Sequence, residues 1–202
     1  MKTNLLSLLK KIPLDLGQGN LRHSTKGKEI ALSLIDIDAR GKTALDVGCR
    51  DGYFSEFLKR RGFTVTSIDI ESNYPAVKIV DANQLLPFDD NYFDLIWCSE
   101  VIEHLENPRA VINEFKRVLK PTGQAIFTTP NSDFWLYRLL KPFGLTAQKL
   151  QNPTHRHFFG LRDIRIFKPE VIYGFFPYMI IKFRITRGIN FLSPTFIFTI
   201  KK

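Results

Sequence analysis

The chain has 202 residues, 44% hydrophobic and 24% charged, a balance typical of one globular domain of ordinary size. The net charge of +9 is uneven, because residues 138–202 hold 12 Lys and Arg against Asp163 and Glu170, a net +10. Two cysteines exclude a disulfide framework and favour a reducing, cytoplasmic compartment. No window approaches about 18 uninterrupted apolar residues, and the N-terminus has no signal-peptide pattern, so we expect no membrane-spanning helix.

The N-terminal part holds two amphipathic helix candidates, residues 4–12 and 27–37. A regular alternation follows, with a strand predicted at 43–47, a helix at 53–62 that ends in glycine, and a β-branched strand at 64–70. Further strands are predicted at 77–80, 93–99 and 123–129, and a helix at 108–120 with a proline near its start.

Strands that alternate with helices predict a Rossmann-like, doubly wound, mostly parallel sheet in a three-layer α/β/α fold. Runs 178–186 and 195–202 are strand-like, and we expect them to pair as a hairpin that adds one antiparallel strand. The chain divides into an N-terminal helical arm, 1–40, and a main domain, 41–202. Within it, 130–168 forms a substrate or lid insertion, with a helix expected at 131–144 and a loop at 150–163.

The stretch "ALDVGCRDGYFSEFL", residues 44–58, predicts a strand, a glycine turn and a helix. Gly48 and Gly52 suit positive φ or close approach of a ligand, and Asp69 closes the next strand, where a ribose requires a carboxylate. Taken singly, the glycines also fit a plain tight turn and Asp69 a helix cap. In a G-x-G-x-x-G pattern Arg50 and Tyr53 would occupy glycine places, which argues against a dinucleotide enzyme.

Four segments in order resemble the class I S-adenosylmethionine-dependent methyltransferases, in particular the small-molecule group that includes the ubiquinone-type O-methyltransferases. They are "LDVGCRDGYF", "IDI", "DANQLLPFDDNYFDLIWCSEVIEHLENP" and "EFKRVLKPTGQAIFTTPN". The resemblance implies that S-adenosylmethionine is the cofactor. It implies further that Asp46, Gly48, Cys49 and Gly52 surround its methionine and ribose, Asp69 binds the ribose, Asp81 and Ala82 meet the adenine, and Ser99 and Glu100 lie beside the sulfonium.

Two departures from the family pattern affect the cofactor site. Arg50 stands where a glycine is usual, so it either reshapes the loop or lets its guanidinium reach the cofactor carboxylate. Only 11 residues separate Asp69 from Asp81, which leaves little room for a helix. This side of the adenine pocket is expected to be open, or closed by the N-terminal arm or a partner.

Methyl transfer from a sulfonium requires in-line positioning and, for a hydroxyl acceptor, a base. Glu100, His104 and His155 are the candidate catalytic residues. In the resembling ubiquinone-type enzymes a Glu-x-x-Glu-His element can hold a divalent cation, so Glu100, Glu103 and His104 form the candidate site for Mg²⁺. The alternative is that Glu100 contacts the cofactor or caps a helix and His104 is a loop residue.

The segment "PTHRHFF" supplies His155 and His157, which share a side if the segment is extended. They suit a base and an anchor for an acidic substrate, although a surface loop is an equal interpretation. Phe134, Trp135 and Tyr137 line a lid or simply pack.

The leading interpretation is methyl transfer to an oxygen of a small molecule, a lipid-linked precursor or a glycan intermediate. The basic C-terminal third and the N-terminal helix favour an anionic acceptor and peripheral contact with a membrane. One alternative is an RNA methyltransferase, although no stacking platform is apparent. A second is a catalytically silent fold that binds the cofactor or a partner. The fourth strand ends in "CSEV", which disfavours base N-methylation.

Overall fold

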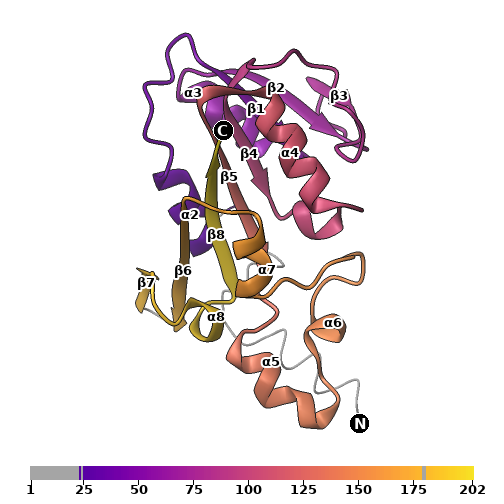
Figure 1. Cartoon of the computed structure of the whole chain (residues 1–202), viewed down its shortest axis with the longest axis vertical. Coiled ribbons are helices and arrows are strands. Elements are labelled where there is room, and N and C mark those ends of the chain that lie inside the picture. Colours follow the sequence, from indigo (N-terminus) through magenta and orange to yellow (C-terminus); the bar gives the residue numbers. More distant parts are fainter. Residues whose placement is uncertain (1–22, 24, 179–180) are drawn as a thin grey trace.

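A computed structural model describes residues 23, 25–178 and 181–202, and an eight-stranded sheet forms its centre. The strand order is β3-β2-β1-β4-β5-β8-β6-β7 (Figure 1). The strands from β3 to β5 are parallel, whereas β8 is antiparallel to β5 and to β6. Their bounds are β1 Thr43–Val47, β2 Thr64–Asp69, β3 Val77–Ile79, β4 Phe93–Ser99, β5 Leu119–Pro130, β6 Val171–Tyr178, β7 Ile181–Ile185 and β8 Thr195–Lys201.

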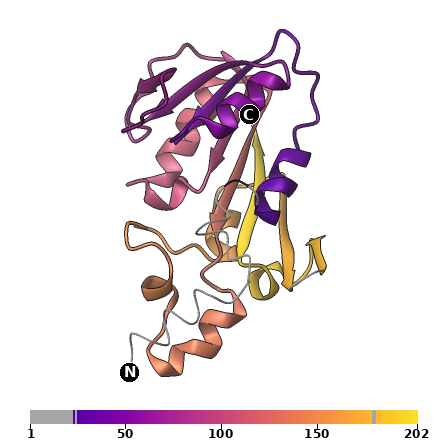
Figure 2. The ribbon, with the colours of Figure 1, turned by 180° about the vertical axis from the view of Figure 1, so that it is seen from behind.

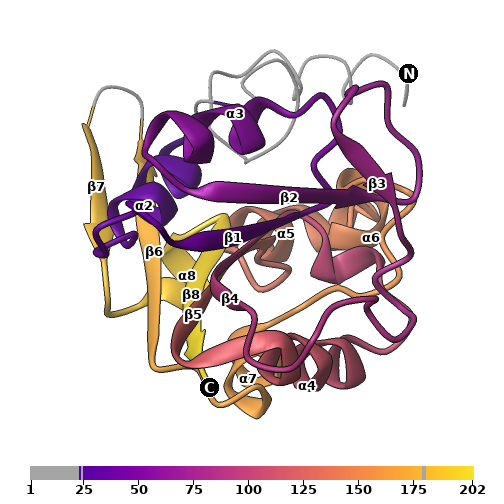
Figure 3. The ribbon, with the colours of Figure 1, turned by 90° about the horizontal axis from the view of Figure 1, so that it is seen from above.

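Helices cover both faces of the sheet, which confirms the predicted three-layer class. Helices α2 (Lys26–Ser33) and α3 (Tyr53–Arg60) lie on one side, and α4 (Pro108–Val118) and α7 (Leu161–Ile166) lie on the other (Figure 3). Each side has its own apolar core, and β4 alternates between them, with Trp97 in the α2 and α3 core and Ile96 in the α4 core. Because β4 is buried on both faces, its central residues, 95–98, form an unbroken apolar run.

The predicted C-terminal hairpin is wrong in its pairing, although the antiparallel strand is confirmed. Strand β7 pairs with β6, a strand that the sequence interpretation missed, and β8 inserts between β5 and β6. A short helix, α8 (Ile189–Leu192), separates β7 from β8. Six of the seven β8 residues are buried, whereas Phe183 and Arg184 of β7 are exposed. The more apolar β8 therefore lies inside the sheet, between β5 and β6, and the more polar β7 lies at its edge.

The insertion after β5 contains short helices. They are α5 (Trp135–Leu140), η2 (Lys141–Phe143) and α6 (Ala147–Leu150), and α5 and α6 lie at one end of the molecule (Figures 1 and 2). The expected loop at 150–163 runs into α7 at its end. The described part of the predicted arm, α2, packs its Ile30 and Ala31 against the sheet. The expected helix at 4–12 lies outside the described residues.

Residues 70–76 form no helix between β2 and β3, as the short spacing predicts. Strand β3 is consequently an edge strand, and Ile79 on it is 64% exposed. Within the described part of the chain, no helix has the length and apolarity needed to cross a bilayer.

Candidate active site

The turn between β1 and α3 is pinned to the end of β2. Gly48 and Gly52 take φ of 70° and 76°, and Arg50 between them takes 49°, a left-handed conformation that a side chain adopts at a cost. The amides of Gly48 and Cys49 both donate to the carbonyl of Ile68, at 2.9 and 3.1 Å. The Arg50 amide donates to Asp69 Oδ2 at 2.8 Å. The turn and the candidate ribose carboxylate therefore form one unit.

The space beside each glycine is filled by a protein side chain. A Cβ on Gly48 would lie 2.5 Å from Val101 Cγ2, and one on Gly52 would lie 2.4 Å from Tyr74 Cδ2. The Tyr74 hydroxyl accepts from Lys59 at 2.7 Å and donates to Glu56. Glycine is therefore required at both positions because Val101 and Tyr74 pack closely against them. The sequence interpretation had instead attributed the two glycines to a tight turn or to the close approach of a ligand.

Asp69 retains acceptor capacity for a ligand. Besides the Arg50 amide, its carboxylate accepts from the Glu71 amide at 3.3 Å, and no other donor to it is found in the described part of the chain; the residue is half-buried. A carboxylate offers about four lone-pair positions, so some remain toward solvent. The Val80 amide donates to the carbonyl of Asp69 at 2.9 Å. This bond brings the exposed Asp81 and the buried Ala82 to the same edge of the sheet.

Asp46 is buried beneath the turn and shares its charge with two serines. Ser55 donates to Asp46 Oδ2 at 2.6 Å, and Ser67 donates to Ser55 at 2.7 Å. Burial raises the pKa of Asp46 to about 7, and the nearby carboxylates of Asp69 and Asp51 add to this rise against the bond from Ser55. The two serines therefore connect Asp46, near the end of β1, to α3 and β2, and Cys49 in the turn is likewise buried.

At the end of β4, Ser99 and Glu100 connect to β5 through Thr128. The hydroxyls of Ser99 and Thr128 lie 2.8 Å apart, and Thr128 donates to Glu100 Oε1 at 3.0 Å. The Glu100 backbone takes φ of 58°, and the only helix in the predicted "SEVIEHL" segment is a single turn, η1 (Ile102–His104). Glu100 and His104 therefore do not share a helical face, because that helix begins after Glu100.

Glu103, His104 and His155 come together, and among the described residues they form a group of possible ligand atoms all within 4.8 Å of one another. Glu100 does not belong to this group. Glu103 Oε2 accepts from Thr129 at 2.9 Å, and Oε1 lies 3.9 Å from His155 Nε2. The rings of His104 and His155 meet edge to face at 4.7 Å.

Burial controls the charges of this group. It raises the pKa of Glu103 well above its usual value, and the neighbouring Glu100 carboxylate raises it further. Burial also lowers the pKa of His155 to about 4, with a contribution from His104. The pKa of His104 falls for the same reason, and the Arg50 guanidinium adds to the fall despite a bond with Thr154. Both imidazoles are thus neutral at pH 7.

The loop after α6 delivers His155 by binding to the backbone of η1. The amides of Arg156 and His157 donate to the carbonyl of Glu103 at 2.8 and 3.0 Å. His157 Nε2 donates to the carbonyl of Leu105 at 2.9 Å. The two histidines therefore diverge, and the expected pairing of His155 with His157 does not occur.

The insertion contributes packing and one polar side chain. Phe134 is fully buried, and it packs with Tyr137 and Ala147 in a small separate core. Burial raises the pKa of Tyr137, whose hydroxyl hydrogen-bonds Gln151 and is influenced by the Glu100 charge. Tyr137 thus lies near the end of β4, whereas Phe134 is ordinary packing.

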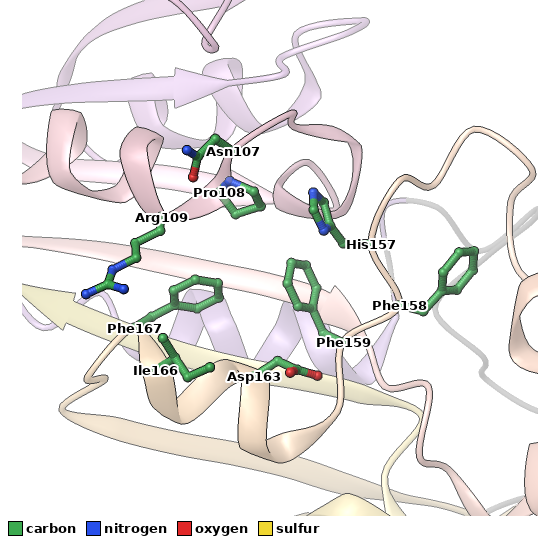
Figure 4. A pocket seen from close by; sticks show the side chains of 9 residues that line it. All are labelled: Asn107, Pro108, Arg109, His157, Phe158, Phe159, Asp163, Ile166 and Phe167. Carbon is green, nitrogen blue, oxygen red and sulfur yellow. The ribbon is translucent and has the colours of Figure 1, made fainter.

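A cavity of about 340 Å³ lies beside this region, between the start of α4 and α7 (Figure 4). Phe159 and Phe167 lie opposite Pro108 and Arg109, and His157 closes one end. Apart from His157, which was a candidate base or anchor, the sequence interpretation assigned no role to these residues. The one signal that pointed here was the aromatic run after His157.

Comparisons with known proteins agree with the sequence resemblance. Residues 22–166 match the model of a methyltransferase domain. Ubiquinone biosynthesis O-methyltransferase of Coxiella burnetii (strain Dugway 5J108-111) is 33% identical over 114 residues, which cover 50% of this chain and 49% of the relative. The corresponding protein of Pseudomonas entomophila (strain L48) is 34% identical over 117 residues, covering 51% and 50%.

The chain spans about half the length of the curated relatives it matches. A solved S-adenosylmethionine-dependent methyltransferase from Mesorhizobium loti shares the fold, with a TM-score of 0.63 at 12% identity over 89% of this chain and 99% of that one. The family match covers more than half of the chain, and the glycine turn and the strand order agree with it. The chain belongs to the methyltransferase-domain family, with the class I S-adenosylmethionine-dependent fold.

Proposed function

We propose that this protein transfers a methyl group from S-adenosylmethionine to an oxygen of a small-molecule acceptor. One observation carries the proposal: the turn joined to Asp69 and the buried group around Glu103 and His155 meet at the carboxyl edge of the same sheet. Ligands of open α/β sheets bind at this edge. The names of the relatives, which specify O-methylation, support oxygen as the acceptor atom.

The cofactor would lie along the turn and the ends of β1, β2 and β4. Asp69 would bind the ribose hydroxyls, Asp81 and Ala82 the adenine edge, and Ser99 would lie near the sulfonium. The residues at the turn, with Arg50 among them, would surround the methionine portion; they are Asp46, Gly48, Cys49 and Gly52.

The reaction needs a hydroxyl held in line with the methyl group and a base for its proton. The methyl group would pass from the sulfonium to the acceptor oxygen, leaving S-adenosylhomocysteine, and His155 Nε2 would take the proton that the acceptor hydroxyl loses. A neutral His155 has a free lone pair for this step. Glu100 and His104 flank the acceptor.

The acceptor is expected to be amphipathic or anionic and presented at a membrane surface. Leu139 and Phe143 in the insertion are 58% and 75% exposed, and Lys141 lies between them. Apolar side chains beside cations suit the boundary of an anionic bilayer. Together with the basic C-terminal third, this surface supports peripheral membrane contact in the cytoplasm.

Calorimetric titration with S-adenosylmethionine tests the first step. The wild-type protein should bind one equivalent, and Asp69→Ala should weaken binding by about 1–3 kcal/mol, the cost of leaving polar partners unpaired. Glu71→Ala is the matched control, because Glu71 is exposed beside Asp69. Equal losses in both variants would move the ribose contact away from Asp69. No binding by the folded wild type would favour a silent fold, and methyl transfer to a panel of phenols and lipid precursors follows only if binding is found.

A further inference from the structure

Three donor side chains converge from two distant segments. Glu103 and His104 belong to η1, whereas His155 arrives on the loop after α6. The distance of 3.9 Å between Glu103 Oε1 and His155 Nε2 is too long for a hydrogen bond. Glu103 and His155 therefore lie side by side without a hydrogen bond between these two atoms.

Glu103 Oε1 is buried without a hydrogen-bond partner within the described part of the chain. The whole residue is 1% exposed, so bulk water does not compensate. A buried carboxylate oxygen left in this way is costly, and a cation is the partner that offsets the cost most fully. The orphaned atom points to a ligand.

Each of the three side chains also contacts a second polar group, on an atom other than the proposed ligand atom. Thr129 donates to the other oxygen of Glu103 at 2.9 Å. His104 Nδ1 lies 3.2 Å from the carbonyl of Thr154, and His155 Nδ1 lies 3.3 Å from Gln151 Oε1. A carbonyl oxygen only accepts, so Nδ1 of His155 carries the proton and its Nε2 keeps its lone pair. His104 Nδ1 lies 3.2 Å from both the carbonyl and the hydroxyl oxygen of Thr154, and the carbonyl favours the same tautomer because the hydroxyl can act as donor or acceptor. This outer pattern is the one that orients histidine ligands of metals.

We propose that Glu103, His104 and His155 bind a divalent transition-metal ion. Two imidazoles and one carboxylate favour Zn²⁺, Co²⁺ or Fe²⁺, whereas Mg²⁺ prefers oxygen ligands and water. Three protein ligands leave further coordination positions open.

This set differs from the Glu100, Glu103 and His104 set that the Glu-x-x-Glu-His resemblance implies. Glu100 receives a bond from Thr128, and its left-handed backbone precedes η1, so the structure replaces it with His155. The exchange of a carboxylate for an imidazole changes the expected metal from Mg²⁺ to a softer ion.

The inference deepens the proposed function, because the ion would lie beside the methyl acceptor. With the ion bound, the lone pair of His155 Nε2 is used for the metal, so His155 no longer acts as the base. The positive charge of the ion would instead lower the pKa of a nearby acceptor hydroxyl, and its proton would pass to the Glu100 carboxylate. The ligand His155 also lies on the insertion, so metal binding would hold the insertion against η1.

The test is metal binding by the full chain after treatment with a chelator. Calorimetry with Zn²⁺ and with Mg²⁺, and the visible absorption of added Co²⁺, are measured on the wild type and three variants. His155→Asn keeps a donor amide toward Gln151 and removes Nε2, and Glu103→Gln keeps the shape. Glu100→Gln is the matched control. Circular dichroism verifies that each variant is folded.

The wild type should bind one Zn²⁺ at least about 100-fold more tightly than Mg²⁺. Because loss of an outer partner alone costs about 10- to 100-fold in affinity, His155→Asn and Glu103→Gln should each lose at least about 100-fold. Glu100→Gln should change the Zn²⁺ affinity by less than about threefold, because Glu100 is neither a ligand nor a partner of a ligand in the proposed site.

The opposite pattern, with Glu100→Gln weakened and His155→Asn unaffected, would overturn the ligand set. Absence of stoichiometric Zn²⁺ and Co²⁺ binding by the folded wild type would overturn the metal site altogether. Titration of the same samples with S-adenosylmethionine separates the two proposals, because cofactor binding without metal leaves the proposed function intact.

Discussion

The two regions of the proposed site, one for the cofactor and one for the acceptor, are built in opposite ways. The cofactor region, residues 46–82, is defined by a backbone turn and by side chains such as Asp69 and Asp81 that remain open to solvent. The acceptor region, residues 99–104 with 128–137 and 151–157, presents side chains such as Glu103 and His155 that are buried before any ligand arrives.

This difference predicts how each region responds to substitution. In the cofactor region a lost side chain can be replaced by water, so affinity changes moderately. In the acceptor region, removal of one side chain leaves its polar partner buried without a hydrogen bond. Water does not reach that partner, so the folded state is destabilised. Variants there should affect catalysis and stability more than cofactor affinity.

The largest expected effect belongs to His155→Asn. As loss of a general base costs about 100- to 10,000-fold, the turnover rate of the chelator-treated, metal-free protein at saturating S-adenosylmethionine should fall within that range. The affinity for S-adenosylmethionine should change by less than about threefold, since His155 lies outside the cofactor region. His157→Asn is the control, because the His157 ring contacts the Leu105 carbonyl and the Phe159 ring and is not part of the group around Glu103. A parallel loss of cofactor affinity would erase the distinction between the regions.

Gly48→Ala should lower the free energy of unfolding by about 2–5 kcal/mol, the sum of a left-handed alanine and overpacking against Val101. Gly41→Ala is the matched control, with φ of 71° and no atom within 4 Å of its added Cβ. Strain alone should cost it about 1–2 kcal/mol. Urea unfolding of both variants measures the difference. Equal losses would mean that Val101 moves aside without cost and that the close approach is unimportant.

Asp94 lies at the amino end of β4, remote from both regions. Its replacement should change the free energy of unfolding but not the affinity for the cofactor. Burial would raise its pKa, but bonds from Lys120, Thr43 and Lys42 outweigh burial and hold the pKa at about 2. Because the folded value lies below the usual 3.8, the unfolded chain takes up the proton first, and stability falls as the pH drops from about 4 to 2.

At 1.36 kcal/mol per pKa unit, Asp94 contributes about 2 kcal/mol above pH 4. The difference in unfolding free energy between wild type and Asp94→Asn should therefore shrink by about 2 kcal/mol between pH 6 and pH 2. A constant difference across this range would contradict the assigned pKa. Cofactor affinity at pH 7 should be the same in both proteins.

The smallest expected effect belongs to Arg50→Gly. The bond from this residue to Asp69 comes from the backbone amide, which glycine retains, and glycine suits φ of 49°. We expect S-adenosylmethionine affinity to change by less than about threefold, below the usual value of one hydrogen bond. Arg50→Lys, which keeps a charge, is the companion variant. A tenfold loss in the glycine variant would instead mean that the guanidinium binds the cofactor carboxylate.

Much of the cofactor region could be predicted from the sequence because its contacts follow from local patterns. The bounds of β1 and β4 match the predicted 43–47 and 93–99, since each is a short apolar run between turn signals. Parallel strands bring their carboxyl ends to one edge, so Asp69 necessarily lies near Gly48. The positive φ of Gly48 and Gly52 follows from the same tight turn.

Only the tertiary structure decided the acceptor region and the C-terminal edge. His155 meets Glu103, which lies 52 positions earlier in the chain, because the amides of Arg156 and His157 bind the Glu103 carbonyl, a contact without a periodic signal in the sequence. Likewise, β8 was recognised as a strand, but burial of both its faces, and not its neighbour in the chain, determined its partners. Local periodicity determines which elements form, whereas packing between distant segments determines which side chains meet.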